Sequence, residues 1–162
     1  MSVEVAELLD VCWLDVSGDY ELKNLNAGKY AVFFVILMKN PSGFEPKVTL
    51  TLVDPDGAKQ QKKVLLTQVT AKKWLTLKVG EFQVRDSDAQ GDREIKFSMT
   101  SIEEMNWKKG LIVQGVLIRQ IAWSLGVPFP YPNSRVIRRE LLVSGKFFTF
   151  QCVCEEQCGF FF

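Results

Sequence analysis

Apolar and polar residues alternate with a period of two along most of the chain up to residue 119. This alternation predicts β-strands, because successive side chains of a strand point to opposite faces of a sheet. The segment 30–38 is nearly all apolar and rich in Val, Ile and Phe, which is typical of a strand buried on both faces. Strands are therefore expected at 12–16, 30–38, 48–52, 75–79, 95–99 and 111–119.

Turn-forming residues separate the alternating segments. They are Ser17-Gly18-Asp19, Asn40-Pro41-Ser42-Gly43, Asp54-Pro55-Asp56-Gly57 and Gln90-Gly91-Asp92. Six or more short strands joined by such turns predict an all-β protein, an antiparallel β-sandwich. No helical period is sustained for more than two or three turns, although residues 3–10 are compatible with one short helix.

The character of the sequence changes after Arg119. Residues 120–162 hold three prolines between 128 and 132, a basic cluster around Arg138, and an aromatic end, and no periodicity holds there. We therefore expect one sandwich domain over residues 4–119 and a C-terminal extension of uncertain structure over residues 120–162.

Composition removes several classes of function. The 162 residues contain no histidine, which excludes Ser-His-Asp and Cys-His catalysis and imidazole metal ligands. The formal net charge of +1 gives no electrostatic reason to expect nucleic acid or a membrane as the partner. The first seven residues are acidic and lack the basic start of a secretory signal, so a cytoplasmic or nuclear protein is expected.

The four cysteines do not form a convincing metal site. Cys152, Cys154 and Cys158 lie close together, and Cys12 is the fourth. Structural zinc usually has four ligands in paired spacing, and three nearby cysteines without histidine fall short of that pattern. We expect no metal and no cofactor, and reduced thiols in a reducing compartment.

Three segments resemble a known family. The first segment consists of Glu4-Val5-Ala6-Glu7-Leu8, Trp13-Leu14-Asp15-Val16-Ser17-Gly18 and Tyr30–Val35. The second consists of Trp74-Leu75 and Gly80-Glu81-Phe82. The third, which is the most specific, runs from Trp107-Lys108-Lys109-Gly110 to Arg119. In that order and spacing they resemble the phloem protein 2 / Nictaba lectin domain of plants, over residues 4–119.

The resemblance implies a jelly-roll-like β-sandwich that binds N-acetylglucosamine oligomers (chitin fragments) and the N-glycan core without catalysis. It also implies a homodimer and a location in cytoplasm, nucleus or phloem sap. Two departures weaken the sugar site. The tryptophan-rich segment that precedes the domain in some members is missing, and the second acid implicated in binding is Ser101 here, whereas the first is kept as Glu94.

The candidate sugar-binding residues gather around Trp107. This tryptophan stands in a charged run between two expected strands, so its indole is expected to be exposed and available to stack on a sugar ring. Trp13 and Trp74 stand inside alternating strands and are more simply core or structural residues. Hydrogen bonds to hydroxyls and the acetamide are expected from Lys108, Glu94, Ser101, Glu104 and Asn106.

Two other functions stay open. Loss of the second acid and of the preceding tryptophans is compatible with a protein-interaction or structural sandwich that no longer binds sugar. Glycoside hydrolysis needs a pair of carboxylates at a fixed separation, and nothing in the sequence indicates such a pair, so we do not expect an enzyme.

Overall fold

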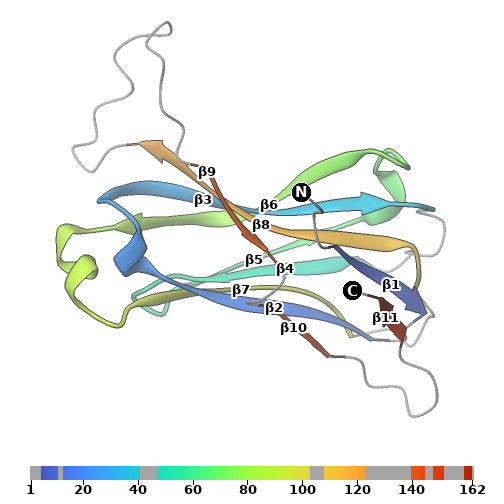
Figure 1. The fold of residues 1–162 in the computed structure, drawn as a ribbon, viewed down its shortest axis with the longest axis horizontal. Coiled ribbons are helices and arrows are strands. Elements are labelled where there is room, and N and C mark those ends of the chain that lie inside the picture. The colour runs from blue at the N-terminus through green and yellow to red at the C-terminus, as the bar shows by residue number, and fades with distance from the viewer. Residues whose placement is uncertain are drawn as a thin grey trace, which may run out of the picture.

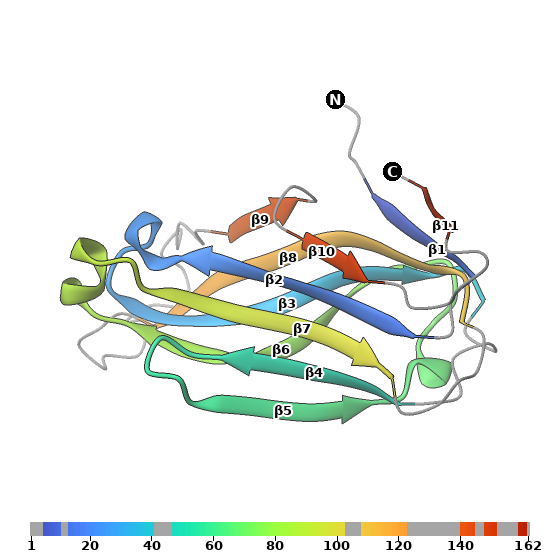
Figure 2. The same cartoon turned by 90° about the horizontal axis from the view of Figure 1, so that it is seen from below.

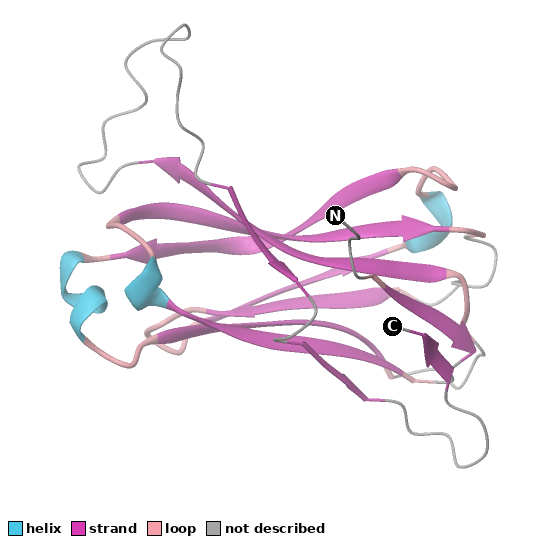
Figure 3. Ribbon diagram, in the orientation of Figure 1, coloured by secondary structure: helices cyan, strands magenta, loops and turns pink. Residues whose placement is uncertain are grey.

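The computed structural model describes residues 5–10, 13–40, 47–102, 108–122, 140–144, 148–151 and 159–161. Its strands form two antiparallel sheets that face each other as a β-sandwich (Figure 1). Helical structure in the described residues is limited to three short 3₁₀ turns at the ends of the sandwich (Figure 3). They are η1 (Leu22–Asn24), η3 (Leu66–Gln68) and η4 (Asp86–Gln90).

The first sheet has the strand order β11-β1-β8-β3-β6. Its members are β1 (Ala6–Asp10), β3 (Gly28–Met38), β6 (Trp74–Val84), β8 (Leu111–Ala122) and β11 (Gly159–Phe161), with β9 (Glu140–Ser144) also paired to β8. β1 pairs with β8 at Val113 and Ile112, and β9 pairs with it from Gly115 to Arg119. Two strands from opposite ends of the chain therefore share one edge of β8.

The second sheet has the order β10-β2-β7-β4-β5 (Figure 2). Its members are β2 (Leu14–Glu21), β4 (Val48–Val53), β5 (Lys59–Val64), β7 (Glu94–Ser101) and β10 (Phe148–Gln151). Three strands in the described part of the region after residue 122 thus pair with strands of the first 122 residues. The division at residue 119 remains a prediction.

The core lies between the sheets and consists of every second residue of each alternating strand, whose side chains point inward. Phe34 of β3 and Phe97 of β7 meet there edge to face, with ring centroids 6.1 Å apart and an angle of 82° between the rings. Both are almost fully buried. The apolar positions of the period-two pattern are therefore the buried ones, and the all-β sandwich expected from this pattern is confirmed.

Two local predictions are wrong. Residues 6–10 form strand β1 and not a helix, because Ala6 and Leu8 point into the core while the backbone pairs with β8 and β11. Ser17-Gly18-Asp19 is not a turn, because β2 continues through it with unbroken pairing to β7 from Leu14 to Glu21. In both cases pairing with a neighbouring strand overrides the local preference of the residues.

Among the described residues, no helix has the length and apolar character needed to cross a membrane.

Candidate functional site

The structure separates the described members of the predicted sugar site. Glu94 begins β7 and Ser101 ends it, so the two lie roughly 23 Å apart along an extended strand. They also point to opposite faces: Glu94 lies on the outer face, whereas Ser101 is buried. The pair that the resemblance suggested is therefore not brought together in this chain.

Two of the predicted residues are buried in the part of the chain that the structure describes. Lys108 has an exposed fraction of 0% and Ser101 one of 5%, so neither side chain lies on the surface. Trp107, Glu104 and Asn106 lie outside the described residues. Their role in sugar binding stays a prediction.

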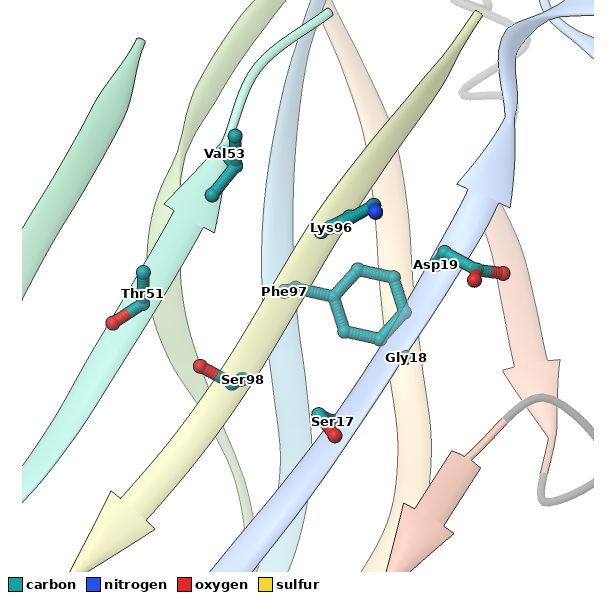
Figure 4. A pocket seen from close by; sticks show the side chains of 8 residues that line it. All are labelled: Ser17, Gly18, Asp19, Thr51, Val53, Lys96, Phe97 and Ser98. Carbon is teal, nitrogen blue, oxygen red and sulfur yellow. The ribbon is translucent and has the colours of Figure 1, made fainter. Parts of the chain in front are cut away.

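A polar hollow lies on the outer face of the second sheet (Figure 4). Its volume is about 260 Å³. Three neighbouring strands, β2, β7 and β4, supply its lining: Ser17, Gly18, Asp19, Thr51, Val53, Lys96, Phe97 and Ser98. Except for Gly18 and Phe97, these residues occupy the outward positions of their strands.

The floor of the polar hollow is formed by the ring of Phe97 and by Gly18, which has no side chain. Phe97 points inward and is only 2% exposed, and Gly18 is its register partner on β2. The ring extends from β7 toward Gly18 (Figure 4). The same phenylalanine therefore packs in the core and closes the bottom of the hollow.

Hydroxyl groups follow one another across the polar hollow. Ser17 of β2 pairs in register with Ser98 of β7, and Ser98 pairs with Thr51 of β4. Gln61 of β5 is the next partner, and its Nε2 donates a hydrogen bond to Thr51 Oγ1 at 3.1 Å. We call Ser17, Ser98, Thr51 and Gln61 the central row.

Charged groups stand beside the central row. Asp19 pairs in register with Lys96, and the Lys96 ammonium lies 3.2 Å from a Glu94 carboxylate oxygen. Glu94 thus stands at the margin of the polar hollow, although it does not line it. On the other side, burial raises the pKa of the Asp15 carboxyl above its usual 3.8.

Sequence reasoning missed most of the polar hollow. The local sequence predicts a turn at Ser17 and Asp19, and the alternation predicts only that Thr51, Lys96 and Ser98 lie on the solvent side of strands. A sequence signal does exist, namely short hydroxyl residues at outward positions of three strands. It acquires meaning only when the register that aligns them is known.

Of the two roles expected for Trp74, the structure excludes the core. The strand pattern favoured a core or structural role, yet 49% of its surface is exposed, at the start of β6. Trp13 is half-buried, and Trp123 lies outside the described residues.

Metal ligands do not cluster in the part of the chain that the structure describes. All four cysteines lie outside the described residues, so their predicted lack of a metal stays a prediction.

The architecture is that of a β-sandwich with a polar hollow on one outer face. The phloem protein 2 family matches this chain over residues 1–120, and the chain belongs to that family. Phloem protein 2-like A1 of Arabidopsis thaliana is 42% identical over 73% of this chain and 48% of its own length. A protein named lectin from Luffa acutangula is 37% identical over 73% of this chain and 56% of its own length.

Phloem protein 2-like A2 of Arabidopsis thaliana is 35% identical, over 72% of this chain and 60% of its own length. This chain therefore aligns with about half to three fifths of each of these relatives. The family resemblance inferred from the three sequence segments is confirmed.

Proposed function

We propose that this chain is a lectin that binds N-acetylglucosamine oligomers and the N-glycan core without catalysis. The observation that carries the proposal is the polar hollow, in which hydroxyls, a carboxylate and an ammonium group converge on one face of the sandwich. The similarity to the Luffa protein named lectin supports the same conclusion.

The lining chemistry suits a sugar. Ser17, Ser98 and Thr51 carry hydroxyls that can each donate and accept a hydrogen bond, as sugar hydroxyls require. The Asp19 carboxylate accepts, and the Lys96 ammonium donates. Val53 offers an apolar contact for an acetamide methyl group. Because the hollow is open and lacks an exposed aromatic platform in its lining, we expect modest affinity, about micromolar to millimolar.

Binding without hydrolysis is the simpler function for this lining. Glycosidases generally use two carboxylates that flank the scissile bond. Asp19 is the one carboxylate among the residues that line the polar hollow, and the nearby Glu94 is ion-paired to Lys96. We therefore propose that the chain retains its sugar unchanged.

The topology, oligomeric state, cellular location and partners that we propose are those that the family resemblance implies. Strands β1 to β8 in the described part of the first 122 residues have the orders β1-β8-β3-β6 and β2-β7-β4-β5, which supports a jelly-roll topology of two interleaved sheets. We propose a homodimer that works in cytoplasm or phloem sap and also in the nucleus. Glycoproteins bearing N-acetylglucosamine would be its partners.

A protein-interaction role is the second candidate. Trp74 favours it, because a half-exposed indole on the outer face of the first sheet is a common anchor in protein interfaces. Phe33, Val35 and Leu37 also point outward from that sheet and are partly exposed.

Titration with chitotriose tests the proposed function. Saturable binding by the unmodified chain supports a lectin, and its absence at millimolar sugar, together with no hit on a glycan array, contradicts it. Asp19→Asn and Lys96→Ala should each weaken binding if the polar hollow is the site. Trp74→Ala is the matched control, because it lies on the other sheet. A loss of binding with Trp74→Ala alone would contradict the polar hollow.

A further inference from the structure

The central row crosses four strands at a constant spacing. Ser17, Ser98, Thr51 and Gln61 are consecutive register partners on β2, β7, β4 and β5. Neighbouring strands lie about 4.8 Å apart, so the row runs roughly 14 Å across the sheet, perpendicular to the strands. Polar groups therefore repeat at an interval close to the length of one pyranose ring in an extended β1,4-linked chain.

Two parallel rows flank the central row. Asp19, Lys96, Val53 and Lys59 are register partners on one side. Asp15, Thr100, Thr49 and Lys63 are register partners on the other side. Acidic residues stand at the β2 end of both flanking rows and lysines at the β5 end. Across these four strands the surface thus has an acidic side at β2 and a basic side at β5, and β10 continues the sheet beyond β2.

The polar hollow covers only part of the surface formed by the central row and the two flanking rows. Its lining comes from β2, β7 and β4, and no residue of β5 belongs to it. Gln61 is exposed, lies one strand beyond the hollow, and is hydrogen-bonded to Thr51. Its side chain is therefore placed to meet whatever extends out of the hollow toward β5.

We propose that an unbranched oligosaccharide lies across the strands along the central row, with about one sugar residue in each of the three intervals between neighbouring strands. This proposal rests on the proposed lectin function. A disaccharide fills the polar hollow over β2, β7 and β4, and a third residue reaches β5 and bonds to Gln61. Gln61 is then the residue that makes the chain prefer three linked sugars over two.

A length series measures this preference. For the unmodified chain, affinity for chitotriose should exceed that for chitobiose by a few-fold to about tenfold, the effect of roughly one added hydrogen bond. Gln61→Ala should remove this preference for chitotriose, because the third sugar then loses its side-chain partner on β5. Ser98→Ala should weaken both sugars, because Ser98 lines the hollow. Thr76→Val, on the outer face of the other sheet, is the control that should change neither.

Nuclear magnetic resonance provides a readout that does not depend on a variant. Chitobiose should shift backbone amide signals of Ser17 and Ser98, and chitotriose should additionally shift Gln61. Equal affinities for the two sugars, an unchanged preference in folded Gln61→Ala, or no shift at Gln61 would overturn this inference and leave the lectin function intact. Absence of binding for both sugars would overturn the lectin function and this inference together.

Discussion

The side chain of Gln60 hydrogen-bonds both backbone polar groups of Glu81. Its Nε2 donates to the Glu81 carbonyl oxygen at 2.6 Å, and its Oε1 accepts from the Glu81 amide at 3.1 Å. Gln60 lies on β5 and Glu81 on β6, which are edge strands of different sheets. One carboxamide therefore takes the place of a neighbouring strand and connects the two layers at the side of the sandwich.

Replacing Gln60 should destabilise the fold. Gln60→Ala leaves a part-buried amide and carbonyl without these bonds, so the free energy of unfolding should fall by about 1–3 kcal/mol. Gln60→Glu should also destabilise, because a carboxylate accepts but cannot donate. Urea unfolding followed by circular dichroism measures both. Lys59→Ala, at an exposed position of the same strand, is the control, and an effect as large as that of Gln60→Ala would contradict the prediction.

Gly80 makes room for the Gln60 bridge, so enlarging it should be costly. A Cβ atom at Gly80 would lie 2.5 Å from Gln60 Oε1 and 2.9 Å from Leu52 Cδ2. Gly80→Ala should destabilise by roughly 1–3 kcal/mol, because it displaces the carboxamide and overpacks the core. In the control Gly91→Ala, the nearest atom to the new Cβ is 3.8 Å away. Equal melting temperatures for the two variants would show that the bridge adapts without loss.

Stability should be flat near neutral pH and fall in acid. No histidine is present, so side chains of ordinary pKa give little change between about pH 6 and 7.5. Hydrogen bonds from Lys29 and Lys78 lower the pKa of Glu81 from 4.5, and the bond from Arg93 lowers that of Asp56 from 3.8. A lowered native pKa gives stability above the unfolded pKa that is lost as pH falls through the native pKa.

Asp15 works in the opposite direction, because burial raises its pKa and its protonation favours the native state. Urea titrations from pH 3 to 7.5 on the unmodified chain and Glu81→Gln isolate the contribution of Glu81. The stability difference between the two should be present at neutral pH and shrink below about pH 4.5. A difference that stays constant through the acid range would refute the assignment.

A fragment of residues 1–122 should fold as a β-sandwich. Among the residues whose burial the structure describes, the core cluster runs from Leu8 to Ile118, and β10 and β11 pair at the outer edges of the two sheets. Circular dichroism should keep its β-type spectrum, with a somewhat lower melting temperature. Newly bare edges should increase self-association, measured by sedimentation. An insoluble or unfolded fragment would mean that the C-terminal strands are required and that the predicted boundary is wrong.

Trp107→Ala decides whether the loop predicted from the sequence contributes to sugar binding. If the indole stacks on the sugar, its removal should weaken chitotriose binding by about 2 kcal/mol, as loss of an aromatic anchor commonly does. Isothermal titration with thermal melts alongside measures this. Equal binding by both proteins would restrict the site to the polar hollow, and a variant that fails to fold would identify Trp107 as a structural residue.

The strands that the sequence predicted are those with an apolar pattern. The alternation at 95–99 is the centre of β7, because burial on one face leaves a period of two. The apolar run 30–38 is β3, but its outer face is partly exposed at Phe33, Val35 and Leu37 and not buried as expected. β5 was missed, since its sequence Lys-Gln-Gln-Lys-Lys-Val is polar on both faces. Such an edge strand is held by pairing with β4 alone within its sheet, and polar charged edges protect against aggregation.

The candidate site was harder to predict than the fold, for a physical reason. Trp107 can be selected from the sequence alone, because an aromatic residue among charged neighbours is easy to recognise there. Ser17, Ser98 and Thr51 are ordinary residues that are separated by more than thirty positions in the sequence. Only the antiparallel register places them side by side, and register depends on long-range pairing that local preferences do not specify.

In each strand beneath the polar hollow, successive side chains alternate between the core and the outer face. Odd-numbered Phe97 and Met99 fill the core, while even-numbered Lys96 and Ser98 face outward. A slip of one residue in the pairing would exchange the two sets of side chains, burying serine and lysine and exposing phenylalanine and methionine. A misaligned chain would thus lose both its core and the surface proposed to bind sugar. One register sets the two together, so no shifted form of this sheet keeps one without the other.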